Sequence, residues 1–279
     1  MKILTLIENR CERDDLIAEH GLSLYIEKDN KKILLDTGES GKFIENAKTM
    51  GININDIDIL VLSHGHYDHV GGVEKFLNEN SKAKVYLKSA VKEECYAKRL
   101  GISKYIGIDK NILKEHFHRL VFVDKLSEID KDIFIITDIV KEYSLPEGNK
   151  YLYIKENGEL KKDDFKHELI LVIKEKNGLV MFTGCAHSGI LNMIKSVKNN
   201  FPKEHIKAVL GGFHLMVIPR ANLSCMDQKD INYIAENIIK EKIDKVYTGH
   251  CTGREGFERL KKVLEDKVEY INTGCCINI

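Results

Sequence analysis

The chain has 279 residues, and its 43 Lys and Arg residues balance 43 Asp and Glu residues, so the formal net charge at pH 7 is zero. This balance gives no indication of a nucleic-acid or anionic-membrane partner, and no stretch approaches the ~20 apolar residues of a transmembrane helix. Seven cysteines without a C-x-x-C pair are typical of reduced thiols in a cytoplasmic protein rather than of a disulfide framework.

The first part of the chain is predicted to be rich in strands. Apolar runs predict strands at 2–8, 22–28, 32–36, 57–62 and 83–87. Helices are predicted at 43–50, ending at Gly51, and from 70 to about 78. The run at 57–62 is short and rich in β-branched residues, which is typical of a buried strand.

Residues 89–118 have a different character. They are charged, with apolar residues at helical spacing, such as Val91, Cys95 and Leu100. We expect this segment to be an insertion that forms a helical cover over the functional site.

The second part of the chain alternates strands with helices. Strands are predicted at 119–123, 133–138, 169–174, 179–183, 206–210, 244–248 and 268–271, and helices at 189–199, 227–240 and 254–265. The segment 141–168 is polar and rich in turns, and Asn177-Gly178 predicts a type I′ hairpin. Without a linker, this pattern predicts one α/β domain over residues 1–279, with two sheets between helices in an αββα layering.

The strongest signal for chemistry is a cluster of metal-binding side chains directly after the run at 57–62. It comprises His64, His66, Asp68 and His69. His64 and His66 point the same way in an extended segment, whereas Asp68 and His69 fall at the start of a helix. The spacing predicts two neighbouring divalent ions, one for each pair. Zinc is the expected metal, with iron or manganese as alternatives.

The string H-x-H-x-D-H after an apolar strand resembles the signature of the metallo-β-lactamase superfamily. Leu34-Leu35-Asp36-Thr37-Gly38 is similar to its strand followed by Asp-x-Gly. Residues 179–184 are similar to a later strand that usually ends in Gly-Asp, and residues 246–250 to the strand that delivers a last histidine. The resemblance covers most of the chain and implies the αββα sandwich and a metal-dependent activity.

Shorter motifs narrow the resemblance to one branch of the superfamily, which is called dihydropteroate-synthase-related. They lie at 19–23, 184–190, 211–215 and 249–253. Archaeal members of this branch include a pterin–aminobenzene-phosphate synthase of the methanopterin pathway, which implies a condensation as one activity for the chain.

Two metal ions need ligands beyond the first four. His187 and His250 both follow predicted strands, so they occupy strand-end loops of the same kind as His64. We predict His64, His66 and His187 around one metal, and Asp68, His69 and His250 around the other. The alternative for His187 and His250 is a buried histidine that contacts no metal.

The sequence departs from the superfamily pattern at Cys185. This position usually holds an Asp that bridges both metals. A thiolate ligates zinc but does not bridge as a carboxylate does, so Cys185 is a candidate ligand and the ordinary hydrolytic mechanism does not carry over directly. A histidine usually precedes the bridging Asp, and His167 is its nearest counterpart here. We prefer His187 as the third ligand and keep His167 as the alternative.

Asp68 and His214 are the predicted catalytic residues. His214 follows a predicted strand and Gly211-Gly212, which let the backbone approach a ligand closely. We expect His214 to face the substrate as a general acid or as a partner for phosphate or carbonyl oxygen.

Four further residues are expected around the site. Arg220 and Arg254 are candidates for binding an anionic group, with a solvated surface arginine as the alternative. Asp36 is expected to support a site histidine. His20 matches the branch motif, but the sequence defines no role for it.

The predicted function is that of a metal-dependent enzyme acting on a small phosphate- or carbonyl-bearing substrate through metal-bound hydroxide. The archaeal relatives imply pterin condensation as an alternative reaction. A metal-binding sensor without turnover is the main alternative of another class. A nuclease is less favoured, because no Lys/Arg cluster lies near the predicted site.

Overall fold

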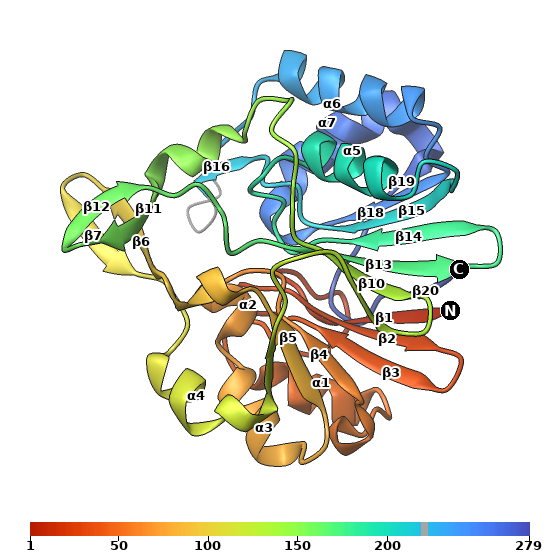
Figure 1. The fold of residues 1–279 in the computed structure, drawn as a ribbon. Helices are drawn as coiled ribbons and strands as arrows, with labels where there is room; N and C mark the ends of the chain where they lie inside the picture. The colour runs from red at the N-terminus through yellow and green to blue at the C-terminus, as the bar shows by residue number, and fades with distance from the viewer. Residues whose placement is uncertain (219–222) are drawn as a thin grey trace. The chain divides into compact units, whose positions relative to one another are not determined.

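The computed structural model describes residues 1–218 and 223–279, and within them the chain divides into two compact units (Figure 1). Unit 1 comprises Met1–Phe122, Tyr153–His167 and Ile271–Ile279, and unit 2 comprises Val123–Leu152 and Glu168–Tyr270. Arg220, a predicted anion-binding residue, lies outside the described residues. The expectation of one domain over 1–279 stays a prediction.

A seven-stranded mixed sheet forms the centre of unit 1, in the order β20-β1-β2-β3-β4-β5-β8. Neighbours from β20 to β3 run antiparallel, and neighbours from β3 to β8 run parallel. The strands are β1 (Lys2–Ile7), β2 (Ser23–Lys28), β3 (Lys31–Leu35), β4 (Ile59–Val61), β5 (Lys84–Leu87), β8 (Leu120–Phe122) and β20 (Cys276–Asn278). Because β3 and β4 are parallel neighbours, their carboxyl ends share one edge, and the Asp36 N–H donates to the Val61 carbonyl oxygen (2.9 Å) there.

Helices α1 (Lys42–Thr49) and α3 (Val73–Glu79) pack on one face of this sheet. The predicted helix from 70 to 78 is divided, because α2 (Tyr67–Val70) ends before Gly71-Gly72 and α3 begins after them. The backbone passes so close to other segments here that a Cβ on Gly71 would lie 2.1 Å from the Glu39 carbonyl oxygen. These two glycines therefore fix the position of the loop that carries the metal-binding cluster.

Unit 2 is built on a second seven-stranded mixed sheet, in the order β19-β18-β15-β14-β13-β10-β9. Its strands are β9 (Ser127–Asp130), β10 (Ile133–Ile136), β13 (Ile170–Glu175), β14 (Gly178–Phe182), β15 (Ile206–Gly211), β18 (Lys245–Thr248) and β19 (Val268–Tyr270). Strands β14, β15, β18 and β19 are parallel. Helices α5 (Ile190–Asn200), α6 (Gln228–Lys240) and α7 (Gly253–Leu264) contribute to one buried cluster with this sheet.

Short elements complete the two units. A two-stranded hairpin is formed by β16 (Met216–Ile218) and β17 (Leu223–Cys225). Single 3-10 turns lie at Ile54–Asp56, Ser89–Lys92, Phe117–Arg119, Glu147–Tyr151, His250–Thr252 and Glu265–Lys267. The predicted strands and helices of both sheets are otherwise confirmed within about two residues.

The prediction of a helical cover over 89–118 is wrong in its secondary structure. The segment contains a β-hairpin of β6 (Glu94–Arg99) and β7 (Ile102–Tyr105), and its one α-helix in the described chain is α4 (Lys110–Glu115). Tyr96 faces Tyr105 across the hairpin, with ring centroids 5.5 Å apart, and such cross-strand pairs stabilise strands. Leu100 is 92% exposed at the turn, so the helical spacing of apolar residues does not mark a buried helix face.

A second hairpin lies in the segment that the sequence predicts only as polar turns. It consists of β11 (Leu152–Glu156) and β12 (Glu159–Lys162), and it belongs to the four-stranded sheet β12-β11-β6-β7. Asn157 and Gly158 form its turn with φ values of 52° and 88°, as a type I′ turn requires. By contrast, Glu175 pairs with Gly178, so the turn predicted at Asn177-Gly178 is formed by Lys176 and Asn177 instead.

No helix among the described residues combines the length and the apolar character that are needed to cross a membrane.

Asn80, buried at the end of α3, joins this helix to the segments that lead into β4 and β5. Its Nδ2 donates to the carbonyl oxygens of Ile54 (2.8 Å) and Ile57 (2.9 Å), and its Oδ1 accepts from the N–H groups of Lys82 and Ala83. We expect Asn80→Ala to lower the free energy of unfolding by about 2–4 kcal/mol, because several buried backbone groups lose their partner.

Urea denaturation followed by circular dichroism measures this change. Asn55→Ala, at an exposed position in the same unit, is the matched control and should change the free energy by less than about 0.5 kcal/mol. Equal effects of the two substitutions would contradict the role of Asn80.

Candidate metal-binding site

The predicted cluster of unit 1 occupies the short loop and helix that follow β4. His64, His66, Asp68 and His69 are all buried, and their side chains gather in one place. The ring of His64 lies 4.7 Å from that of His66 and 4.2 Å from that of His69, centroid to centroid. The structure therefore brings the four predicted residues of this loop together.

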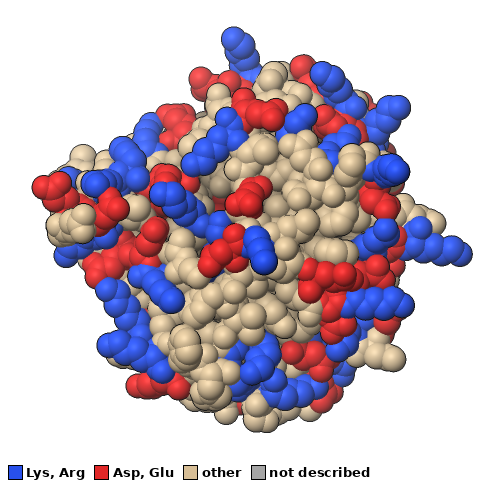
Figure 2. All heavy atoms as spheres, viewed as in Figure 1, with Lys and Arg blue, Asp and Glu red and all other residues tan. Residues whose placement is uncertain are grey.

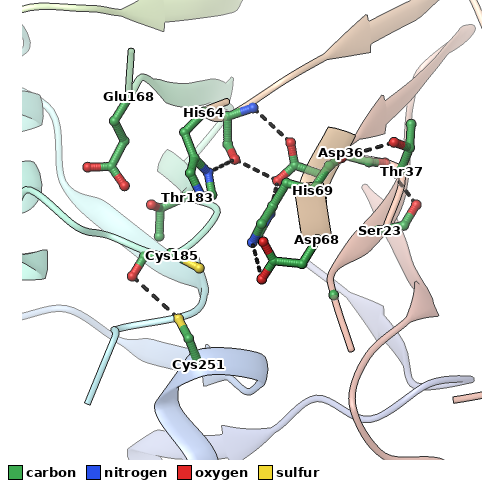
Figure 3. A network of polar contacts seen from close by, with 12 residues as sticks. Ser23, Asp36, Thr37, His64, Asp68, His69, Glu168, Thr183, Cys185 and Cys251 are labelled. Carbon is green, nitrogen blue, oxygen red and sulfur yellow. Dashed lines mark hydrogen bonds and ion pairs between the residues drawn. The ribbon is translucent and has the colours of Figure 1, made fainter. Parts of the chain in front are cut away.

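The carboxylate of Asp36 holds this loop from the adjacent strand end (Figure 3). Its Oδ1 accepts the backbone N–H of Ser63 (2.7 Å), and its Oδ2 accepts the hydroxyl of Ser63 (2.6 Å) and Nδ1–H of His69 (2.6 Å). Asp36, which was expected to support a site histidine, therefore contacts His69 directly.

These contacts determine which nitrogen of each imidazole can bind a metal. His69 donates Nδ1–H to Asp36, so its lone pair lies on Nε2. The hydroxyl proton of Ser63 is used by Asp36, so Ser63 Oγ accepts Nδ1–H from His64 (2.9 Å), and His64 also carries its lone pair on Nε2. An imidazole oriented by a hydrogen bond at its other nitrogen is the usual form of a metal ligand.

His66 is also kept neutral. Burial lowers its pKa to about 4, and burial lowers the pKa of His64 well below the ordinary value. Both rings are therefore deprotonated at neutral pH, as metal ligands must be.

His167, the alternative third ligand, lies in unit 1 beside His66, with ring centroids 5.2 Å apart. The backbone N–H of Gly65 donates to His167 Nδ1 (3.2 Å), and Nε2 faces Asp163 Oδ2 (3.1 Å). Burial opposes a charge on this ring, but Cys95 and Asp163 together raise the pKa of His167 well above its ordinary value. His167, held by Asp163, anchors Gly65, the residue between the two histidines of the H-x-H motif, and its role as a metal ligand stays a prediction.

His20 contacts the cluster through Asp68. Its Nε2 lies 3.3 Å from Asp68 Oδ2, and its side chain keeps 17% of its surface exposed. The structure thus supplies the contact that the sequence did not predict, a partly exposed imidazole on a buried carboxylate.

His187 of unit 2 lies in the loop between β14 and α5, and two residues orient it. Asn149 Nδ2 donates to the His187 carbonyl oxygen (2.7 Å), and Asn149 Oδ1 lies 3.1 Å from Nδ1, where it accepts Nδ1–H. Glu168 is fully buried, and its two oxygens accept the N–H groups of His187 (2.8 Å) and Ser188 (2.7 Å). His187 therefore carries its lone pair on Nε2, as His64 and His69 do.

The sequence analysis missed Asn149 and Glu168. A signal for Glu168 existed, because it is a charged residue directly before the apolar run of β13, where an unpaired carboxylate would be costly. Nothing in the sequence indicated a functional role for Asn149, because it lies in a segment whose composition is typical of polar turns.

Cys185, His214 and His250 are buried in the same unit. The Cys185 thiol lies within 4.8 Å of a ring nitrogen of His187 and of His250. The ring of His214 lies 4.2 Å from that of His187, and its backbone N–H donates to the sulfur of Cys251 (3.2 Å). Figure 3 shows the thiol of Cys251 donating to the Cys185 carbonyl oxygen.

Arg254 lies on α7, where it forms an ion pair with Glu258 (2.6 Å) and remains about half exposed. Its role in binding an anion stays a prediction. The predicted grouping of His64 and His66 with His187, and of Asp68 and His69 with His250, also stays a prediction.

Comparisons with known proteins agree with this chemistry. A family model described as the metallo-β-lactamase superfamily matches residues 17–154. An uncharacterised protein of Methanocaldococcus jannaschii is 30% identical over 94% of each chain. A second protein of that organism, 7,8-dihydropterin-6-methyl-4-(β-D-ribofuranosyl)-aminobenzene-5′-phosphate synthase, is 28% identical over 98% of this chain and 95% of its own.

The crystal structure of a metal-dependent hydrolase of the β-lactamase superfamily matches 100% of this chain and 99% of its own, with 30% identity and a TM-score of 0.84. The αββα fold predicted from the sequence is thereby confirmed.

Substitution of Asp36 by Asn should weaken metal binding in unit 1. The amide cannot accept all three hydrogen bonds that the carboxylate accepts, so the tautomers of His64 and His69 are no longer enforced. We expect zinc affinity to fall about 10–100-fold. Competition with a chelating dye measures it, and Asp29→Asn, at an exposed turn, is the control that should leave it unchanged. Equal affinity of the two variants would contradict the role of Asp36.

The metal-free protein should lose stability as the pH falls. The unfolded chain binds a proton at His66 near pH ~6.5, and the folded chain only near pH 4, so the unfolded state binds more protons between these values. The stability is complete above pH ~6.5, and about 3 kcal/mol of it is lost as the pH falls to about 4. Urea denaturation with a chelator should show a smaller loss in His66→Gln. The same pH slope in both proteins would refute the buried neutral state of His66.

Proposed function

Because the chain belongs to the metallo-β-lactamase superfamily, we propose that it is a metal-dependent hydrolase of a small phosphate- or carbonyl-bearing substrate. The observation that carries the proposal is the shared orientation of His64, His69 and His187. Each ring commits Nδ1 to a hydrogen-bond partner and presents the lone pair of Nε2. Histidines that bind a metal usually donate their other ring N–H to such a partner, so this pattern supports a cation site.

The donor set fits a pair of divalent ions, with zinc expected before iron or manganese. The proposed ligands are those predicted from the sequence: His64, His66, Asp68, His69, His187 and His250, with Cys185 as a candidate. The bound ions would supply Lewis acidity toward the substrate and lower the pKa of water.

Side chains of the protein would accept and donate the protons of the proposed hydrolysis. Asp68, a predicted catalytic residue, lies within reach of His20, so a proton taken up at the Asp68 carboxylate can pass to a partly exposed imidazole. His214, the other predicted catalytic residue, packs against His187 and is proposed to donate a proton to the leaving oxygen of the substrate.

Substitution of His69 by Ala tests the proposal. We expect the purified wild-type protein to hydrolyse at least one of p-nitrophenyl phosphate, bis-p-nitrophenyl phosphate and a simple lactone in the presence of zinc or manganese. His69→Ala should reduce the rate at least ~100-fold and lower the bound metal per chain, because an oriented ligand is lost. The readouts are p-nitrophenol release, lactone titration and elemental analysis.

His118→Ala is the matched control, because His118 is exposed on a short 3-10 turn of unit 1. It should leave both the rate and the metal content unchanged. Full activity and full metal content in His69→Ala would refute the site, and metal binding without turnover on any substrate would favour the sensor function instead.

Condensation is the second candidate, and the synthase of M. jannaschii favours it because the similarity spans nearly the whole of both chains. In this reaction an arylamine would attack a pterin derivative and displace its phosphate-bearing leaving group. Release of that leaving group only when the arylamine is present would favour condensation, and release with water alone would favour hydrolysis.

A nuclease remains disfavoured. Lys and Arg side chains alternate with Asp and Glu side chains over the face seen in Figure 2, and no continuous basic stripe is visible on that face. Proteins that hold nucleic acid need such a stripe to neutralise phosphates.

A further inference from the structure

Unit 2 contains a pocket of about 350 Å³ that uses none of the proposed metal ligands. Its walls are the loop that begins at Tyr143, the first turn of α5, the side chain of Phe213 and part of α6. Pockets for small molecules usually have volumes of about 300–1,000 Å³. This pocket can therefore accept one ring with a short side chain.

One wall of the pocket is held rigidly by Asn192 of α5, which is fully buried. Its Oδ1 accepts the N–H groups of Glu142 (2.9 Å) and Tyr143 (2.7 Å), and its Nδ2 donates to the carbonyl oxygens of Tyr143 (2.9 Å) and Ser188 (2.8 Å). The three bonds to Glu142 and Tyr143 fix the backbone that presents the Tyr143 ring. A wall fixed before binding reduces the entropy cost of ordering it around a ligand.

Aromatic rings provide much of the lining. Tyr143 and Tyr233 face the pocket with their ring centroids 6.5 Å apart, and Phe213, in the segment that follows β15, also lines it. The faces of such rings carry negative electrostatic potential, which attracts organic cations.

The charged groups of the pocket favour the same kind of ligand. Among the described residues that line it, Glu147 and Asp230 are acidic and none is Lys, Arg or His. Glu147 also forms an ion pair with Lys150, so Asp230 supplies the charge that selects a cation. Among the described residues that line the pocket, an anionic ligand would meet the like charge of Asp230 and no basic side chain.

The pocket adjoins the histidine pair of the proposed enzyme. Gly189, which lines the pocket, lies two residues after His187, and Phe213 directly precedes His214. Asn149, which orients His187, belongs to the same loop as the pocket residue Glu147. A ligand in the pocket is therefore held by the segments that also position these two histidines.

We propose that this pocket binds the cationic part of the substrate, an organic ammonium group that a short alkyl chain joins to an aromatic ring. This rests on the proposed function, because it assigns the pocket to the substrate of that reaction. The substrate would then carry an aryl-alkyl ammonium group in addition to its phosphate or carbonyl group.

Three probes of similar size test the charge preference: phenethylamine, phenethyl alcohol and phenylacetate. Binding is measured on the full-length, metal-free protein by calorimetry and by ligand-observed magnetic resonance at pH 7. We expect phenethylamine to bind at least 10-fold more tightly than phenylacetate, with the alcohol in between. Equal affinities, or a preference for phenylacetate, would overturn the proposal.

Two substitutions assign the binding to this pocket. Asp230→Asn should weaken phenethylamine at least fivefold and leave the alcohol unchanged, whereas Tyr233→Ala should weaken all three probes. Tyr233 is 53% exposed, so its truncation should not prevent folding. Asp29→Asn, at an exposed turn of unit 1, is the control that should bind like the wild type. Unchanged phenethylamine binding in both pocket variants would also overturn the proposal.

The failure of this proposal is distinguishable from failure of the proposed function. Binding of the probes needs neither metal nor turnover, so His69→Ala should bind phenethylamine like the wild type while it loses hydrolysis. Hydrolysis without ammonium binding would reject the pocket alone, and ammonium binding without hydrolysis would reject the hydrolase alone.

Discussion

The buried carboxylate of Asp36 is the interaction on which the metal-binding loop of unit 1 depends. It receives three hydrogen bonds from Ser63 and His69, and it reaches them because β3 and β4 are parallel neighbours whose carboxyl ends share one edge. Without such donors a buried carboxylate would be costly, so the loop and the carboxylate hold each other in place. The consequence for function is that His64 and His69 present Nε2 rather than Nδ1.

In unit 2, different residues orient the imidazole of His187. Glu168 is the buried carboxylate of this unit, and it accepts the backbone N–H groups of His187 and Ser188 rather than a side-chain donor. Asn149 then fixes the tautomer of His187 through an amide oxygen. In both units a side-chain acceptor on Nδ1–H determines the orientation of an imidazole, which fits metal binding better than a purely structural use of histidine.

The loop over residues 143–149 both borders the proposed substrate pocket and contacts His187, a proposed metal ligand. Asn192 holds one end of the loop, and Asn149 at its other end contacts His187. The pocket bordered by this loop is aromatic and acidic, whereas divalent ions held by the proposed ligands would attract anionic or polarised oxygen. A substrate with an aryl-alkyl ammonium group at one end and a phosphate or carbonyl group at the other would satisfy both.

The sequence by itself determined most strands and helices of both sheets, the αββα fold and the cluster at residues 64–69, because these depend on local periodicity and on short spacing. It did not predict the edge strands β9 and β20. The tertiary structure decided what depends on distant partners. The hairpin of β6 and β7 is stabilised by cross-strand pairs such as Tyr96 and Tyr105. The spacing of apolar residues, from which a helix was predicted, does not record such pairs. Glu168 and Asn149 act on His187 only because the fold brings them to it, and the pocket exists only where α5 and α6 meet the loop at Tyr143. Such contacts join segments far apart in the chain, so no local pattern records them.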